Sequence, residues 1–510
     1  MMSSSSMSRS RKILIHVSAT GLYMVWLALI FISVPLGPLQ LTLFLVTAFF
    51  AVAILIAIIR PQAVLSVFCA VTFIVYIPVA ILDSNVPLLI LDILLGIGLI
   101  QTFAMQRKGR FRILGGSRLV AICLALYVCS VLLGLINDNT ISWVNAVQGM
   151  RTWLFGMGFL VLSSARMNSS RAVDGFLKVF LLGSLFAALY GLRQFAVGLV
   201  PFEYARLITG GSLAIEILYA KLTRIPSSLS MPTAFAFAML TAVLLLPALR
   251  LPQIRRKAVR RIYLLGLGSL LLVGLLISSM RGPLLALAVA VVFIFLVQRR
   301  RISTKLVKIL LLVAVIVAFA NIALSYDFAQ SDNALIRSTG KVIESALSAI
   351  PLPITDTQSE RQRGMAIGIA SRLRQMEEFI PIIVSHPFGV GVGTVTTKQG
   401  ILNFEAPEIG YLRIMAETGW FGLIAYLGIF LSIPWVAYRK LKSISNKYVV
   451  VLGYQLLGLW VAYGVATATG WYLETEISSG VAWIVAGILL NLDVIALSEQ
   501  GVMNESVNPT

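Results

Sequence analysis

Four arginines lie within or beside apolar segments, where a charged side chain is costly. They are Arg151, Arg193, Arg224 and Arg281. A guanidinium group stays charged and binds phosphate oxygens through paired hydrogen bonds, so a converging set of arginines suits a pyrophosphate group. Snorkelling to lipid phosphates is the alternative, above all for Arg193. Arg151 lies roughly 12 Å inside its segment at 1.5 Å per residue, which is too deep to snorkel easily.

A long polar segment, residues 326–408, interrupts the apolar chain and supplies further groups for chemistry. It carries seven Lys and Arg residues, among them Arg372, and it ends at Glu408. A bilayer hides most of the chain, so an exposed polar segment of this length is where water-facing chemistry can occur. We therefore interpret this segment as half of an active site, with the membrane segments supplying the other half.

The sequence predicts neither a metal site nor a cofactor. His16 and His386 are the only histidines, and Cys69, Cys123 and Cys129 all lie in apolar stretches. Their spacing is not typical of a zinc or iron site, and the polar segment has no cysteine that could form a disulfide.

Transmembrane helices must position these groups. Of the 510 residues, 58% are hydrophobic and 12% are charged, which excludes a soluble globular protein. Stretches of about 20 apolar residues recur, and each must be helical because lipid leaves no other partner for the backbone. We predict an all-α polytopic membrane bundle of about fourteen helices, with twelve or thirteen as alternatives. The predicted spans are 13–33, 38–59, 62–82, 86–105, 118–136, 143–165, 172–198, 229–249, 261–278, 282–298, 306–325, 409–437, 448–468 and 478–497.

The spans divide the chain into four parts. Residues 1–136 are N-terminal transmembrane helices, and residues 137–325 are central helices with an arginine-lined outer face. Residues 326–408 form a large periplasmic loop, and residues 409–510 form the last transmembrane helices with a short cytoplasmic tail. Within the loop, apolar residues recur at helical spacing over 369–383, which predicts an amphipathic helix at the membrane interface or against the loop's own core.

The formal charge of +20 reflects membrane topology. Lys and Arg cluster in alternate short connections, and the connections between them are nearly free of basic residues. This alternation follows the positive-inside rule, so we predict that both termini lie in the cytoplasm and that no nucleic acid is bound.

Four stretches resemble motifs of the O-antigen ligase/polymerase superfamily, in the right order around one large loop. Arg224-Ile-Pro-Ser-Ser-Leu-Ser-Met-Pro-Thr-Ala-Phe-Ala is similar to its "R…G-T-F-x-x-P-x-x-F-A" stretch, and Ser278-Ser-Met-Arg-Gly282 to its "S-R-G" turn. Arg372, followed by Pro387 and Gly-Val-Gly, is similar to its "R…P-x-x-G-x-G" segment. Residues 408–422 resemble its closing "H-N-x-Y-L-x-x-x-x-E-x-G-x-x-G" motif. The resemblance covers roughly residues 140–440.

The resemblance implies an inverting, metal-independent glycosyltransferase of the bacterial inner membrane. Its donor would be an undecaprenyl-pyrophosphate-linked oligosaccharide and its acceptor a glycan hydroxyl on the periplasmic side. Membrane lipids and a chain-length regulator protein are further expected partners. Arg151, Arg193, Arg224 and Arg281 would bind the pyrophosphate, while Arg372 would stabilise its departure.

The sequence departs from the family pattern at the catalytic base. The family's His-Asn pair is Glu408-Ile409 here, which makes Glu408 the candidate base. The alternative is an acid at the start of the following helix, favoured by the helix dipole.

Five further residues of these motifs are expected to have structural roles. Glu417 and Gly419 belong to the closing motif, and a small residue such as Gly419 suits close helix packing. His386 and Pro387 precede the glycine-rich run, and Gly391 lies within it. That run does not have P-loop spacing, so we interpret it as a tight turn that returns the chain to the membrane.

Three functions remain in competition. A polymerase that joins repeat units of O-antigen or an exopolysaccharide is favoured, because the His-Asn pair of the ligases is missing. An O-antigen ligase with a lipid A core acceptor is the nearest alternative. A lipid-linked oligosaccharide flippase is a third, but it needs no large outer loop, and we see no internal repeat.

Overall fold

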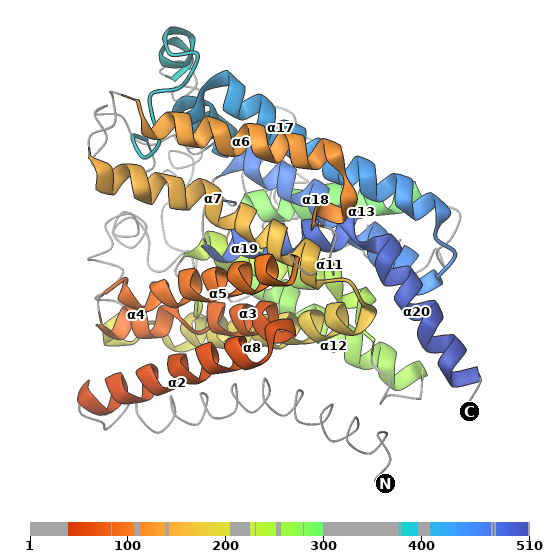
Figure 1. Ribbon diagram of the computed structural model, residues 1–510. Coiled ribbons are helices and arrows are strands. Elements are labelled where there is room, and N and C mark those ends of the chain that lie inside the picture. Colours follow the sequence, from red (N-terminus) through yellow and green to blue (C-terminus); the bar gives the residue numbers. More distant parts are fainter. Residues whose placement is uncertain are drawn as a thin grey trace, which may run out of the picture.

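The chain folds into a bundle of helices whose axes are roughly aligned with one another (Figure 1). The computed structural model describes residues 39–82, 84–106, 113–137, 142–203, 225–229, 231–250, 257–278, 280–298, 377, 379–395, 409–470, 473 and 476–507. Every regular element in these ranges is a helix. This confirms the prediction of an all-α membrane fold.

The helices follow the apolar segments of the sequence closely. The first group is α2 (Leu39–Ile59), η1 (Pro61–Ala63), α3 (Val64–Thr72), α4 (Tyr76–Leu82), η2 (Val86–Leu88), α5 (Leu89–Gln106), η3 (Ile113–Gly116) and α6 (Arg118–Leu135). The central group is α7 (Trp143–Arg166), α8 (Ser170–Val197), α11 (Pro232–Leu245), η4 (Leu246–Ala248), α12 (Lys257–Ile277) and α13 (Arg281–Gln298). The last group is α17 (Gly410–Ser443), α18 (Lys447–Thr469), α19 (Glu476–Leu490) and α20 (Leu492–Val507).

The described helices account for six to eight membrane spans. Six are long and apolar enough to cross a membrane, and two bent helix pairs raise the number to eight. The predicted count of about fourteen is therefore not established. The predicted spans 13–33 and 306–325 lie outside the described residues, and α11 and α13 are shorter apolar helices.

Two predicted spans are broken, each for an identifiable physical reason. The span 62–82 consists of α3 and α4, because Pro78 has no N–H to donate and is placed in the first turn of a new helix. The span 478–497 consists of α19 and α20, bent by 60°. Asn491 lies at this bend, where its side-chain nitrogen donates to the backbone oxygens of Ser164 (2.6 Å) and Met167 (3.2 Å).

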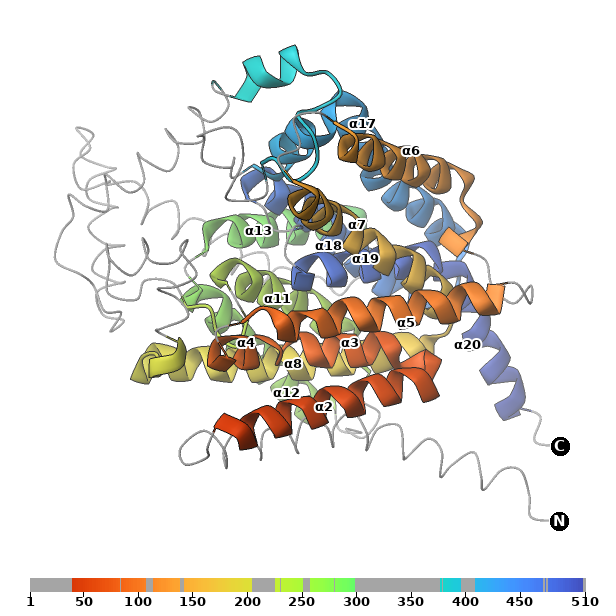
Figure 2. The same ribbon diagram turned by 60° about the vertical axis from the view of Figure 1, so that its left-hand side comes forward.

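Helices α18 and α19 lie in the middle of the bundle, between α2 on one side and α6 and α17 on the other (Figure 2). Helix α7 packs on α19, α6 packs on α17, and α13 packs on α18. The centre is rich in aromatic rings: Phe430 stacks on Trp460 with 4.6 Å between ring centroids, and Phe237 stacks on Tyr463 at 4.4 Å. This packing fixes the mutual positions of α7, α17 and α19.

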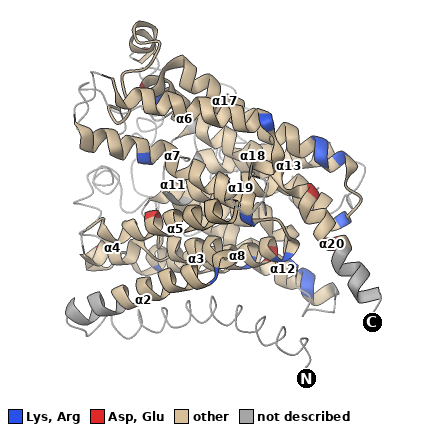
Figure 3. Ribbon diagram, in the orientation of Figure 1, with Lys and Arg blue, Asp and Glu red and all other residues tan. Residues whose placement is uncertain are grey.

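Basic side chains gather at one end of the bundle, where α17 ends and α6 and α12 begin (Figure 3). Polar contacts hold the helices together there. Arg250 donates to both carboxylate oxygens of Glu499 at 3.1 and 3.0 Å, and Lys440 donates to Asp493 at 2.7 Å. The described residues of the long polar segment, 377 and 379–395, lie at the opposite end of the bundle (Figure 1).

Candidate functional site

The end of the long polar segment lies among three helices. Residues 386–395, hereafter the docked segment, follow a helical turn over 379–385. The backbone N–H of Val392 donates to Gly134 O of α6 (3.1 Å), and that of Val390 donates to Ala416 O of α17 (2.8 Å). The Asn137 amide donates to Gly389 O at 3.0 Å. The docked segment is therefore held by its backbone, as expected where a loop must satisfy its polar groups next to apolar helices.

Glycine is required at two points of this contact. Gly393 has φ +82°, and a Cβ there would lie 2.1 Å from Asn145 O at the start of α7. Gly419 interrupts α17 with φ +70°, and a Cβ there would lie 2.2 Å from Pro387 O. Both conformations are disfavoured for residues with a side chain, and both contacts bring backbone against backbone.

The Glu417 carboxylate lies at the centre of the contact and is fully buried. Its Oε2 accepts hydrogen bonds from the Trp153 indole (2.6 Å) and from Gly393 N (3.1 Å), and its Oε1 accepts one from Val395 N (2.9 Å). An ionised carboxylate is an acceptor only, so three N–H donors match its requirements. Glu417 thus joins α7, α17 and the docked segment.

The other predicted structural residues border this centre. Pro387 accepts a hydrogen bond from Trp420 N at 3.0 Å, just after the interruption at Gly419. Gly391 has φ +101° and accepts a hydrogen bond from the Thr394 hydroxyl at 2.7 Å. The imidazole Nδ1 of His386 is 3.1 Å from Ile382 O, within its own helical turn.

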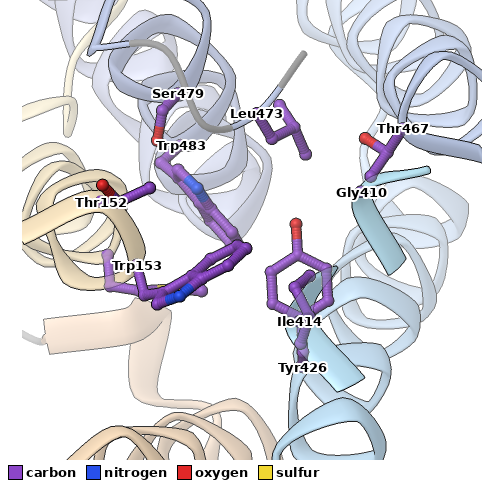
Figure 4. A pocket seen from close by; sticks show the side chains of 10 residues that line it. Thr152, Trp153, Gly410, Ile414, Tyr426, Thr467, Leu473, Ser479 and Trp483 are labelled. Carbon is purple, nitrogen blue, oxygen red and sulfur yellow. The ribbon is translucent and has the colours of Figure 1, made fainter. Parts of the chain in front are cut away.

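A narrow cavity adjoins this centre, lined by α7, α17, α18 and α19 (Figure 4). The rings of Trp153 and Trp483 lie on one wall, and the Tyr426 ring lies opposite them. The remaining lining residues include three hydroxyl side chains and the first residue of α17, and they are Thr152, Met157, Gly410, Ile414, Thr467, Leu473 and Ser479.

The cavity residues were not predicted from the sequence. Trp153, Tyr426 and Trp483 lie inside predicted spans, where an aromatic residue is usually part of the apolar core. Hydroxyl residues such as Thr152 and Ser479 near them are the only signal that could have indicated a polar cavity. That signal is weak, because hydroxyls in membrane helices commonly bond to their own backbone.

The two predicted pyrophosphate ligands that the structure describes both form ion pairs. Arg151 donates from Nε to the Asp92 carboxylate of α5 at 2.9 and 3.0 Å, and both side chains are about one-third exposed. Arg193 donates to the buried Glu203 at 3.2 and 3.3 Å. Pairing with an acid lowers the cost of placing an arginine near lipid. The structure does not bring Arg151 and Arg193 together with each other.

The remaining predicted site residues are not placed. Glu408, Arg372 and Arg224 lie outside the described residues, and for Arg281 only its place as the first residue of α13 is described. Glu408 precedes Gly410 of the cavity wall by two positions in the sequence. Among the described residues, no group of three or more His, Cys, Asp or Glu could hold a metal ion.

Residues 266–427 match the protein-family model described as O-antigen ligase. The match begins within α12 and ends within α17, so it includes the docked segment and Glu417. A comparison with curated proteins gave no match.

Proposed function

We propose that this multi-pass membrane protein, a member of the O-antigen ligase/polymerase superfamily and hence a membrane glycosyltransferase, is a polysaccharide polymerase. It would join undecaprenyl-pyrophosphate-linked repeat units of O-antigen or an exopolysaccharide on the periplasmic side of the inner membrane. The observation that carries the proposal is the family match across the long polar segment and its two flanking helix regions. The hydroxyl- and aromatic-lined cavity beside the end of that segment supports it, because sugar rings present both hydroxyls and apolar faces.

The proposed reaction is a single displacement. Glu408 takes the proton of the acceptor hydroxyl, whose oxygen attacks the anomeric carbon of the donor. The bond from that carbon to the pyrophosphate oxygen breaks, and the undecaprenyl pyrophosphate leaves with the electron pair. Arg224, Arg281 and Arg372 would stabilise the charge that develops on it. Inversion at the anomeric carbon follows from one displacement, and no metal ion takes part.

Arg151 and Arg193 would join this site by exchanging partners. Each already contacts a carboxylate, which occupies the place that a phosphate oxygen would take. A pyrophosphate carries more charge than one carboxylate and offers more oxygens, so it can compete for a guanidinium group. Under this proposal Asp92 and Glu203 hold the two arginines in place until the donor arrives.

We propose a topology with about fourteen spans, both termini in the cytoplasm and residues 326–408 in the periplasm. The gathering of Lys and Arg at one end of the described bundle supports it (Figure 3). A cysteine introduced at Asn333 should react with an impermeant thiol reagent added outside, and one at the exposed Ser445 should not. The background should lack Cys69, Cys123 and Cys129. Labelling of Ser445→Cys in intact spheroplasts would refute this topology.

A polymerase and a ligase differ in the acceptor that they need. Purified protein in liposomes with only the lipid-linked repeat unit should give a ladder of longer lipid-linked products, because a polymerase uses this substrate as donor and acceptor. Gel electrophoresis and mass spectrometry of the lipid fraction would measure the ladder. A ligase would give no ladder, and would transfer the glycan only after a lipid A core is added. That outcome would replace the polymerase by the ligase.

A further inference from the structure

We infer that Glu417 is a positioning residue: it docks residues 386–395 on the membrane helices and so fixes Val395, the residue from which the chain continues towards Glu408. The inference rests on the proposed function, in which Glu408 is the catalytic base. It assigns the buried carboxylate a part in the reaction that goes beyond helix packing.

The carboxylate links parts of the chain that are distant in sequence. One donor, Trp153, belongs to α7, and two donors, Gly393 N and Val395 N, belong to the docked segment. The two backbone donors fix the path of the docked segment and not merely one side chain. Because Glu417 is fully buried and both of its oxygens accept these bonds, it cannot reach an acceptor sugar and act as the base itself.

The two residues that flank positions 396–408 lie in one part of the structure. Residues 396–408 connect Val395 to Ile409. Val395 and Ile409 belong to one small apolar cluster, together with Phe379, Ile383, Val390, Leu412, Met415 and Ala416. Glu417 accepts a hydrogen bond from Val395 N, so it directly holds the residue that precedes positions 396–408. Loss of the bond between Glu417 and Val395 N would release Val395. It would therefore raise the entropic cost of bringing Glu408 to the substrate.

The same carboxylate also orients a wall of the cavity. The Trp153 indole donates to Glu417 through Nε1 while its ring lines the cavity (Figure 4). The orientation of this ring and the docking of the loop therefore depend on one acceptor. A change at Glu417 is expected to disturb both at once.

Glu417→Gln tests the inference. The amide is of similar size, but one of its two ends is a donor and would face an N–H group of the docked segment or of Trp153. We expect kcat per folded molecule to fall at least tenfold, with KM for the lipid-linked donor nearly unchanged, because the residues proposed to bind the pyrophosphate are other residues than Glu417. Trp153→Phe, which removes one donor and keeps an aromatic ring, should give a smaller fall. Glu377→Gln, at an exposed carboxylate before the docked segment, is the matched control and should leave kcat unchanged.

A disulfide that replaces the docking distinguishes positioning from a purely structural role. A Cβ on Gly134 would lie 3.5 Å from the Val392 Cβ, within the range of disulfides. In a background without native cysteines, the pair Gly134→Cys and Val392→Cys should cross-link readily when Glu417 is present and more slowly with Glu417→Gln. Once formed, the cross-link should restore most of the lost kcat, and reduction should remove it again.

The outcomes that contradict the inference are distinct. Wild-type kcat in Glu417→Gln would overturn it, as would a complete cross-link that restores nothing. Failure of the pair to cross-link with Glu417 present would contradict the docking itself. Mass spectrometry follows cross-linking without any substrate. The cross-linking rate could depend on Glu417 in a protein that makes no polymer. That result would support the docking by Glu417 and refute the proposed polymerase function.

Discussion

Glu408→Gln is expected to reduce polymer formation to a small residual rate while the protein remains folded and inserted. Glutamine keeps the size of the side chain but cannot accept the proton of the acceptor hydroxyl. A positioned general base contributes roughly 10²–10⁴-fold to the rate, so the loss should be within this range. Glu408→Asp, which keeps the carboxylate but shortens the reach, should lose less activity than Glu408→Gln. The measurement is the rate of ladder formation per mole of purified, monodisperse protein.

Glu405→Gln provides the control, because it changes an acid three positions earlier in the same stretch. It should make polymer at the wild-type rate. If Glu408 serves only as an acid near the helix start of α17, its amide variant should lose some thermal stability and keep its activity. Wild-type polymer formation by Glu408→Gln would mean that the base lies elsewhere or that none is needed.

Lysine replacement of the arginines is expected to have the second large effect. Arg→Lys keeps the positive charge but loses the two parallel hydrogen bonds to phosphate oxygens. Of the variants at Arg151, Arg224, Arg281 and Arg372, at least two should lose roughly 10²-fold in kcat, comparable to the removal of one donor from a charge-stabilising site. Lipid-linked donor turnover in liposomes gives the rates.

Arg439→Lys is the matched control, since this exposed arginine lies near the basic end of α17. It should leave the rate unchanged. Full activity in all four Lys variants at normal expression would refute a pyrophosphate site built from these arginines. An experimental structure in which their guanidinium groups point into separate regions would refute it as well.

The positions of the helices were largely predictable from the sequence. Residues 38–59, 118–136 and 448–468 were predicted as spans, and the structure has helices over Leu39–Ile59, Arg118–Leu135 and Lys447–Thr469. Hydropathy suffices here because a segment in lipid can satisfy its backbone only within itself. The order of the motifs also predicts the resemblance to the O-antigen ligase/polymerase superfamily, and a family model described as O-antigen ligase matches residues 266–427.

Partners across the bundle could not be predicted. The arginine at 151 was interpreted as a phosphate ligand, and the structure shows its ion pair with Asp92, 59 positions earlier. The bend at Asn491 depends on the carbonyl groups of Ser164 and Met167 at the end of α7, more than 320 positions earlier. Hydropathy carries no information about which helix faces which.

The candidate site likewise has features that the sequence predicts and contacts that it does not. Sequence motifs predict that Glu417 and Gly419 belong to a closing motif that follows a glycine-rich run. The partners of Glu417 become visible in the folded chain alone: Trp153, 264 positions away, and backbone groups of the docked segment. The physical reason is that local sequence fixes backbone conformation, whereas a buried carboxylate takes its donors from whichever segments the packed bundle brings to it.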